Sequence, residues 1–205
     1  MLSFKVHDDS TTGCGVTAII LAGGKSSRMG RDKAFLEFRG KTFSEFLIGL
    51  VSPMVDEILL VVDDRNKFPS STPNVKIVED KIKGQGPLVG IWSGLLEIKN
   101  DSAFVLSCDM PLVRTAQLEN LRDQDSADAD VICFVDAEGR PQPFPAIYKK
   151  GCAGKMDFVI QRGQFAMKDF LKKAVVKTVS RAQGISTDFF NVNTKEDYEF
   201  LTVSS

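Results

Sequence analysis

Histidine and cysteine are scarce in this sequence, which limits the chemistry that the protein can perform. The 205 residues include one histidine, His7, and four cysteines that form no C-x-x-C pair: Cys14, Cys108, Cys133 and Cys152. Zinc sites usually combine closely spaced cysteine and histidine ligands, so we expect no zinc site and reduced, mostly buried thiols. Catalysis that depends on a histidine general base is also nearly excluded.

A strong charge imbalance and long apolar runs are missing as well. Lysine and arginine total 26 against 27 aspartate and glutamate residues, so the formal net charge of -1 argues against a protein that coats nucleic acid or an anionic membrane. No apolar run approaches the roughly 20 residues of a membrane span, and the amino terminus lacks the apolar stretch of a signal peptide. We therefore expect a cytoplasmic protein with neither nucleic acid nor membrane as a partner.

The composition that is present is that of an ordinary globular protein. Hydrophobic residues make up 43% of the chain and charged residues 26%, which suits one domain with a sizeable core. Residues 1–13 mix charge with Ser, Thr and Gly and show no period, so we predict a loose amino-terminal extension and assign it no function. The domain itself should span residues 14–205.

The most informative stretch is residues 21–33, which read L-A-G-G-K-S-S-R-M-G-R-D-K. It follows the short β-branched run V-T-A-I-I at residues 16–20, which predicts a strand covered on both faces. Glycines allow backbone N–H groups to turn toward a ligand, and cations on the same segment favour an anionic ligand. The glycines are Gly23, Gly24 and Gly30, and the cations are Lys25, Arg28, Arg31 and Lys33. This pattern predicts a phosphate-binding loop at the end of a core strand.

Spacing excludes two common phosphate-binding motifs. A Walker A loop needs a glycine five positions before its Gly-Lys-Ser, and the residue five positions before Gly24 is Ile19. The dinucleotide fingerprint G-x-G-x-x-G is not matched either. A basic surface turn after a strand is the simple alternative that remains.

Strands and helices alternate after this loop. Thr42 and Glu45 form an S/T-x-x-E capping box for a helix that Pro53 ends. After an extended piece at 34–38, strands are predicted at 57–62, 75–78, 103–108, 130–135 and 175–179, and helices at 87–98, 149–162, 165–173 and after Thr194. This order predicts an α/β fold, a single-domain, doubly wound, mostly parallel sheet with helices on both faces. Residues 141–148 should return as an extended segment whose three prolines prevent regular pairing in the sheet centre.

Three aspartates follow predicted strands, namely Asp63, Asp80 and Asp109. Ligands of open parallel sheets gather beyond the carboxyl ends of the strands, so these carboxylates should face the same crevice as the cationic loop. Mg²⁺ binds one or two carboxylates together with substrate phosphates, which makes Asp109 in its C-D-M-P setting the predicted metal ligand. The alternative is that Asp109 caps the helix that begins near Thr115. The glycines before Pro87 would bring a helix amino terminus to the crevice as a second wall.

Four motifs in the same order resemble those of the molybdenum cofactor guanylyltransferases. They are the L-A-G-G-x-S-x-R-M-G-x-D-K loop, the stretch from E-D to G-P-L-V-G-I at 79–91, R-P-Q-P at 140–143 and N-V-N-T at 191–194. The resemblance covers residues 16–203 and implies the fold of the nucleotide-diphospho-sugar transferases. It also implies transfer of GMP from GTP to the molybdenum-molybdopterin cofactor, with Mg²⁺ and release of pyrophosphate. Proteins that deliver the cofactor, and molybdoenzymes that accept the product, would be further partners.

The resemblance also implies roles for single residues. Arg28, Lys33 and Asp109 would be catalytic, because Arg28 and Lys33 would hold the triphosphate and Asp109 the metal. The nucleotide would be bound by Leu21, Ala22, Gly23, Gly24, Lys33, Asp80 and Asp109, with Asp80 on the nucleoside. The N-V-N-T element would line the pterin site, although on its own it reads as a helix cap and turn. Such chemistry rests on positioning and on neutralising charge, so it needs no histidine.

One position departs from the family pattern. An asparagine that contacts guanine commonly ends the second strand, and the corresponding residue here is Val62. A valine side chain makes no hydrogen bond, so base recognition would pass to Asp80, to Asp63 or to backbone groups. One rival reading is a transferase that uses CTP, whose loop typically reads L-A-A-G, and Gly23 favours GTP. The other rival is a catalytically silent module with this fold, against which the loop cations and Asp109 argue.

Overall fold

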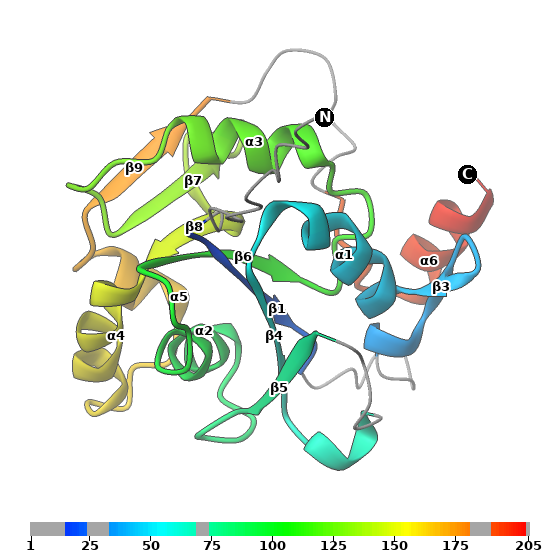
Figure 1. Ribbon diagram of the computed structural model, residues 1–205, viewed down its shortest axis with the longest axis horizontal. Coiled ribbons are helices and arrows are strands. Elements are labelled where there is room, and N and C mark those ends of the chain that lie inside the picture. The colour runs from blue at the N-terminus through cyan, green and yellow to red at the C-terminus, as the bar shows by residue number, and fades with distance from the viewer. Residues whose placement is uncertain (1–14, 24–32, 69–73, 181–189, 204–205) are drawn as a thin grey trace, which may run out of the picture.

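A seven-stranded sheet forms the middle layer of the computed structural model, which describes residues 15–23, 33–68, 74–180 and 190–203 (Figure 1). The strand order is β5-β4-β1-β6-β8-β7-β9. Their bounds are β1 Thr17–Leu21, β4 Glu57–Val62, β5 Val75–Glu79, β6 Ser102–Ser107, β7 Val131–Val135, β8 Pro141–Lys149 and β9 Val176–Val179. Neighbouring strands are parallel except where β8 pairs antiparallel with β6 and β7. The predicted α/β fold with a mostly parallel sheet is confirmed.

Helices cover both faces of this sheet because successive residues of each strand point to opposite sides. Ala18 and Ile20 of β1 pack in the core on one face, under α1 (Phe43–Val51) and α3 (Thr115–Asp123). Ile19 and Leu21 pack on the other face. That face carries α2 (Pro87–Leu95), α4 (Ala153–Ile160) and α5 (Met167–Leu171). The sheet therefore has no large solvent-facing side in the described part of the chain.

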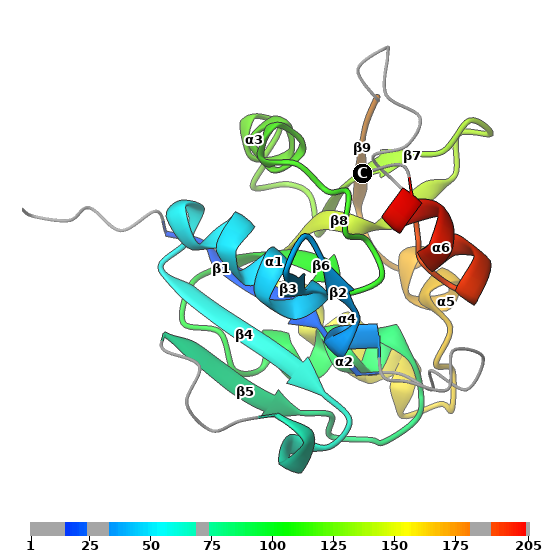
Figure 2. The same ribbon diagram turned by 90° about the vertical axis from the view of Figure 1, so that its right-hand side faces the viewer.

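A third, smaller core lies at the carboxyl-terminal end of the chain. The hairpin β2–β3 (Glu37–Phe38 and Lys41–Thr42) and α1 pack there against α6 (Lys195–Val203) (Figure 2). Its buried residues are Leu36, Phe38, Phe43, Val192 and Leu201. The last helix is thus fastened to the segment that follows the predicted phosphate loop.

Local sequence signals set most of these boundaries. The Thr42 hydroxyl accepts a hydrogen bond from the Glu45 N–H at 3.2 Å and the Glu45 carboxylate accepts from the Thr42 N–H at 2.8 Å, so the predicted capping box is confirmed. Several boundaries were predicted wrongly: the helices expected at 149–162 and 165–173 are the shorter α4 (Ala153–Ile160) and α5 (Met167–Leu171). The helix that begins at Pro87 ends at Leu95 rather than at residue 98, because the Glu97 N–H closes a tighter turn on the Gly94 carbonyl at 2.9 Å. The extended piece at 34–38 is a 3-10 turn, Lys33–Phe35, followed by β2.

Other short elements complete the chain. Three further 3-10 helices lie at Ser52–Met54, Arg65–Lys67 and Lys150–Cys152. Cys108, Cys133 and Cys152 are buried, as predicted, while Cys14 lies outside the described residues. Burial raises the pKa of the Cys133 thiol to about 11 and that of Cys152 to about 12. Among the residues that the structure describes, no helix is both long and apolar enough to cross a bilayer.

The three prolines of the predicted extended segment lie in β8. This strand lies in the interior of the sheet, between β6 and β7, while the expected loss of regular pairing is found at Pro143 and Pro145. The regular ladder with β6 uses Ala146–Lys149, which follow the prolines. Pro143 and Pro145 fall where the register with β7 shifts, so no N–H donor is missed in the regular part.

Candidate functional site

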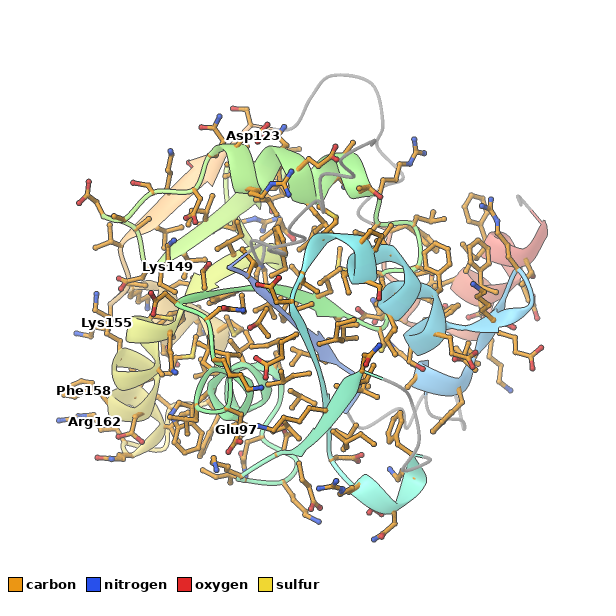
Figure 3. The ribbon with its side chains drawn as sticks, viewed as in Figure 1. Glu97, Asp123, Lys149, Lys155, Phe158 and Arg162 are labelled. Carbon is orange, nitrogen blue, oxygen red and sulfur yellow. The ribbon has the colours of Figure 1, made fainter. Side chains whose placement is uncertain are left out.

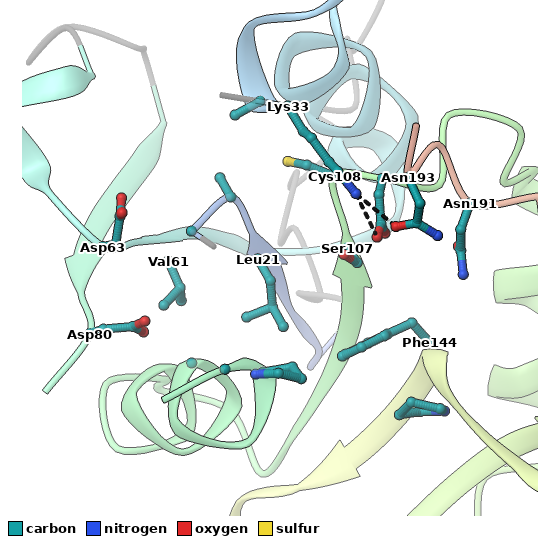
Figure 4. Close-up of a pocket in the computed structure, with 18 of the residues that line it drawn as sticks. Leu21, Lys33, Val61, Asp63, Asp80, Ser107, Cys108, Phe144, Asn191 and Asn193 are labelled. Carbon is teal, nitrogen blue, oxygen red and sulfur yellow. Dashed lines mark hydrogen bonds and ion pairs between the residues drawn. The ribbon is translucent and has the colours of Figure 1, made fainter. Parts of the chain in front are cut away.

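A pocket of about 560 Å³ lies beyond the carboxyl ends of the parallel strands. The chain runs outward from β1 to β4 and β5 and then returns to the other side of β1 as β6, so the order of strands reverses between β1 and β6. Open α/β sheets bind ligands at such a reversal. The lining residues are Leu21, Ala22, Gly23, Lys33, Ala34, Val61, Asp63, Asp80, Gly84, Gly86, Pro87, Gly90, Ser107, Cys108, Asp109, Pro143, Phe144, Asn191 and Asn193 (Figure 4).

The end of β1 forms the floor of this pocket. Leu21, Ala22 and Gly23 line it as predicted, while Gly24 and Arg28 lie outside the described residues, as do the other loop cations before Lys33. The Ala22 N–H donates to the Val61 carbonyl at 2.8 Å, and the Leu21 carbonyl accepts from the Cys108 N–H at 3.0 Å. The Ala22 N–H and the Leu21 carbonyl are therefore already hydrogen-bonded to neighbouring segments of the chain. Hydrogen bonds from this segment to a phosphate would have to begin at Gly23 or later.

Gly23 is a glycine because of a close backbone approach. A Cβ at this position would lie 2.8 Å from the Asp63 nitrogen and 3.2 Å from the Val62 carbonyl carbon. Both contacts are with backbone, which cannot turn away as a flexible side chain can. The end of β1 thus reaches the end of β4 closely only while position 23 lacks a side chain.

Lys33, Asp109 and Asn193 meet on one wall of the pocket (Figure 4). The Lys33 ammonium donates to the Asn193 carboxamide oxygen at 2.8 Å and lies 3.7 Å from an Asp109 carboxylate oxygen. The side chains of Lys33 and Asp109 are 20% and 24% exposed, so both are accessible from the pocket but sheltered from bulk water. The Asp109 carbonyl also accepts from the Val192 N–H at 2.8 Å, which fastens the carboxyl-terminal segment to the end of β6.

Asp109 does not cap a helix. The residue that caps α3 is Arg114, and the Asp109 carboxylate points into the pocket toward Lys33 instead. No group of three or more acidic, histidine or cysteine residues that could hold a metal by itself occurs within the described ranges. Mg²⁺ needs no such cage, because it takes one or two carboxylates and completes its shell with phosphates and water. The donor set around Asp109 therefore fits a magnesium ion that arrives with a phosphate ligand.

Asp80 presents a buried acceptor to the same pocket from the end of β5. The residue is half-buried, and its Oδ1 atom is fully buried without a hydrogen-bond partner. Burial, with the nearby charges of Asp63 and Glu79, raises the pKa of this carboxyl from 3.8 to about 6. A buried acceptor without a donor is costly, and Oδ1 lies against Gly90 of α2, where solvent does not reach it.

Val62, where an asparagine was expected from the family pattern, is the last residue of β4. Val62 is fully buried on the α1 side of the sheet, whereas Val61 and Asp63 line the pocket. The side chain at position 62 therefore takes no part in the pocket wall. The Asp63 carboxylate is reached by the Lys67 ammonium, at 3.2 Å from both of its oxygens.

The wall opposite Asp63 and Asp80 includes residues from the second half of the chain (Figure 4). Asn191 and Asn193 both line the pocket while Val192 is buried between them, as the alternation of side chains along an extended segment requires. Thr194 and Asp197 form the predicted cap: the Asp197 N–H donates to the Thr194 hydroxyl at 3.1 Å, and the Thr194 N–H donates back to the Asp197 carboxylate at 2.8 Å. These contacts give α6 a defined start next to the pocket.

The R-P-Q-P segment contributes less than its motif suggests. The Arg140 guanidinium donates to Asp136 at 2.7 Å and to Glu138 at 2.8 Å; its side chain is 72% exposed and does not line the pocket. The residues that line the pocket are Pro143 and Phe144. The sequence did not predict Phe144 as a pocket residue, because no spacing pattern marks it. Ser107 and Cys108 were not predicted either, although both lie at the carboxyl end of a parallel strand, where ligands of such sheets gather.

Comparisons with known proteins agree with this geometry. A sequence model of the family "MobA-like NTP transferase domain" matches residues 18–179. A protein of Natranaerobius thermophilus named "Probable molybdenum cofactor guanylyltransferase" is 33% identical over 191 residues, which covers 90% of this chain and 93% of that protein. One of the same name from Peptoclostridium acidaminophilum is 34% identical over 191 residues, covering 88% of this chain and 86% of its own length.

A solved structure shows a similar fold. It is the crystal structure of molybdopterin-guanine dinucleotide biosynthesis protein A from Archaeoglobus fulgidus, with a TM-score of 0.79. The two chains are 24% identical, and the match covers 92% of this chain and 97% of that one. At this identity the comparison supports the arrangement of the strands and helices.

Proposed function

Because this chain belongs to the MobA-like NTP transferase domain family, we propose that it transfers GMP from GTP to the molybdenum-molybdopterin cofactor and releases pyrophosphate. Membership of the family makes the chain a nucleotidyltransferase. GTP as donor and this cofactor as acceptor are proposed on the names of its relatives and on the geometry of the pocket. The observation that carries the proposal is the meeting of Lys33, Asp80 and Asp109 in one pocket at the strand reversal.

The proposed reaction is an in-line displacement at phosphorus. An oxygen of the acceptor's terminal phosphate forms a bond to the α-phosphorus of GTP, and the bond from that phosphorus to the bridging oxygen breaks as pyrophosphate leaves. Such a transfer needs positioning and neutralised charge rather than a covalent enzyme intermediate. This requirement is consistent with a pocket that, among the residues that the structure describes, is lined by lysine and aspartate side chains and by no histidine.

On the phosphate side, the chain supplies one well-placed cation and one anion. Lys33 would bind phosphate oxygens as a point charge, and Arg28, which lies outside the described residues, is proposed to assist it. Asp109 would hold Mg²⁺, which when bound would offset the charge of the phosphates. The amino terminus of α2 lies across the pocket at Pro87, where its dipole favours an anion.

On the base side, Asp80 is the proposed reader of guanine. The N1–H and N2–H groups of guanine are donors, whereas the corresponding N3 and O2 atoms of cytosine are acceptors. Above about pH 6 the Asp80 carboxylate is charged and accepts hydrogen bonds only, so it would favour guanine. Asp63 is a weaker candidate because its oxygens already face Lys67.

The experiment that tests the function is a turnover assay with each of the four nucleoside triphosphates, Mg²⁺ and molybdenum-molybdopterin cofactor. Release of pyrophosphate with GTP, accompanied by the guanine dinucleotide form of the cofactor, is the expected result. A catalytically silent module would release no pyrophosphate with any of the four. A higher kcat/KM with CTP would replace the guanylyltransferase proposal with a cytidylyltransferase.

A further inference from the structure

The carboxyl-terminal segment reaches the nucleotide side of the pocket through Asn193. We propose that Asn193 is a positioning residue for Lys33 that preorganises the ammonium group for the triphosphate, in addition to any contact that it makes with the acceptor. This inference rests on the proposed function, because it requires that the pocket bind a magnesium nucleotide. It joins residues that are 160 positions apart in the chain.

The contact between Lys33 and Asn193 is a hydrogen bond from a cation to a neutral acceptor. An ammonium group carries only donors, so the Asn193 atom 2.8 Å from it must be the carboxamide oxygen. The distance from Lys33 to Asp109 is 3.7 Å, which is beyond hydrogen-bond length. Asn193 therefore sets the direction of the ammonium group more closely than Asp109 does. The Asn193 oxygen is neutral overall, so it holds the cation without cancelling its charge.

The backbone around Asn193 is held by several hydrogen bonds. The backbone N–H groups of Asn193 and Thr194 both donate to the Asp197 carboxylate at 2.8 Å. Val192, the preceding residue, is completely buried in the small core, and its N–H holds the Asp109 carbonyl. Tyr198, in the first turns of α6, donates its hydroxyl to the Glu37 carbonyl at 2.8 Å. Asn193 is thus fixed from both sides along the chain.

The contact with Asn193 orders the Lys33 side chain before a ligand binds. A lysine side chain has a flexible four-carbon stem, and ordering it costs conformational entropy when a ligand binds. When the pocket wall already holds the side chain, this entropy is lost during folding, so ligand binding is less costly. The Asn193 carboxamide also has two N–H donors, so the same side chain can face an anionic acceptor while its oxygen holds Lys33.

The test is the affinity for GTP with Mg²⁺, measured by calorimetric titration in the absence of any acceptor. Asn193→Ala should weaken GTP binding about fivefold to tenfold, the size expected for one ordinary net hydrogen bond. Asn120→Ala is the matched control, because Asn120 lies in α3 and is not among the residues that line the pocket. Its GTP affinity without acceptor should equal that of the wild type.

A double-mutant cycle separates positioning from a general structural effect. If Asn193 acts through Lys33, then Asn193→Ala should cause no further loss in a Lys33→Ala background. Additive losses, or a loss of acceptor affinity with unchanged GTP affinity, would overturn the inference while the proposed function stands. A wild type that binds no nucleotide would overturn the proposed function and this inference together.

Discussion

Asp109 occupies a position where charge matters more than shape. Its backbone carbonyl fastens Val192 and its carboxylate faces Lys33, so an asparagine would keep the backbone contact and lose only the charge. Asp109→Asn should therefore remain folded and lower kcat by about a hundredfold or more, since a metal that acts on transition-state charge contributes several kcal/mol. Steady-state kinetics with GTP checks this.

Asp123→Asn is the matched control for that substitution. Asp123 is exposed at the end of α3, on the surface and away from the pocket (Figure 3). The same loss of one carboxylate should leave kcat unchanged there. Near wild-type turnover in a folded Asp109→Asn variant would remove Asp109 from the proposed metal site.

The Asp80 carboxyl predicts a stability that depends on pH. Its pKa is 3.8 in the ordinary case and about 6 in the folded protein, with burial as the main cause. Below about pH 4 the group is protonated in both the folded and unfolded states, so its favourable contribution is fully present. The contribution is lost as pH rises through about 6, because the folded chain must then hold a partly buried charge beside Asp63.

Asp80→Asn removes this ionisation and should make the protein more stable at neutral pH. The gain in the free energy of unfolding over wild type should grow between about pH 4 and pH 7 by roughly 1 kcal/mol, a value reduced for partial exposure. Urea denaturation at several pH values measures it. A gain that does not change with pH would show that Asp80 is not the titrating group.

Some residue-level features were predictable and others were not. Asp63, Asp80 and Asp109 were found because each follows a buried strand, and strand ends share one edge of a parallel sheet. The unpaired Asp80 oxygen and the bond between Lys33 and Asn193 were not found, because both depend on how side chains meet across distant segments. Sequence periodicity contains no information about such contacts.

At the scale of elements, the junction of β1 and β4 depends on Gly23. A methyl group there would meet the Asp63 nitrogen at 2.8 Å, so Gly23→Ala should push the two strand ends apart. We expect a loss of about 1–3 kcal/mol in the free energy of unfolding, together with weaker GTP binding because Asp63 and the loop move. Chemical denaturation and GTP titration measure the two effects.

Gly49 supplies the control for this glycine substitution. It is an exposed residue within α1, and a Cβ there would have nothing within 4 Å. Gly49→Ala should therefore stabilise the protein by about 0.5–1 kcal/mol, because alanine is the better helix former. If Gly23→Ala proved equally harmless, the close approach of β1 to β4 would not be a constraint on this loop.

Most elements were predictable because their signals are local. The run of β-branched residues in β1, the capping box at Thr42 and Glu45 and the proline at the start of α2 each act within a few residues. The interior position of β8 was not predictable, because it depends on which strands flank it rather than on its own composition. A proline-rich strand can lie centrally when its prolines fall at a shift of register.

At the scale of the whole molecule, the chain builds its pocket from both ends. The end of β1 is hydrogen-bonded to Cys108, and the segment before α6 contacts Asp109 and Lys33, so both ends of the described chain line one pocket at the end of β6 (Figure 4). The resemblance to a family predicted which motifs would gather, and the fold explains how they do. We propose that base selection rests on residues other than position 62, because the Val62 side chain is buried away from the pocket.

We expect GTP to be preferred over ATP and CTP, with Asp80 as the main source of that preference. Asp80→Ala should lower the ratio of kcat/KM values for GTP over CTP by about tenfold or more, because guanine would lose an acceptor for its N–H groups. Asp63→Ala should lower it less, since the Asp63 carboxylate is already engaged by Lys67. Competition between paired nucleotides measures the ratio for the wild type and both variants. A larger effect at Asp63 would place the base nearer to β4 than to β5, and a wild type that prefers CTP would mean that the pocket reads a different base.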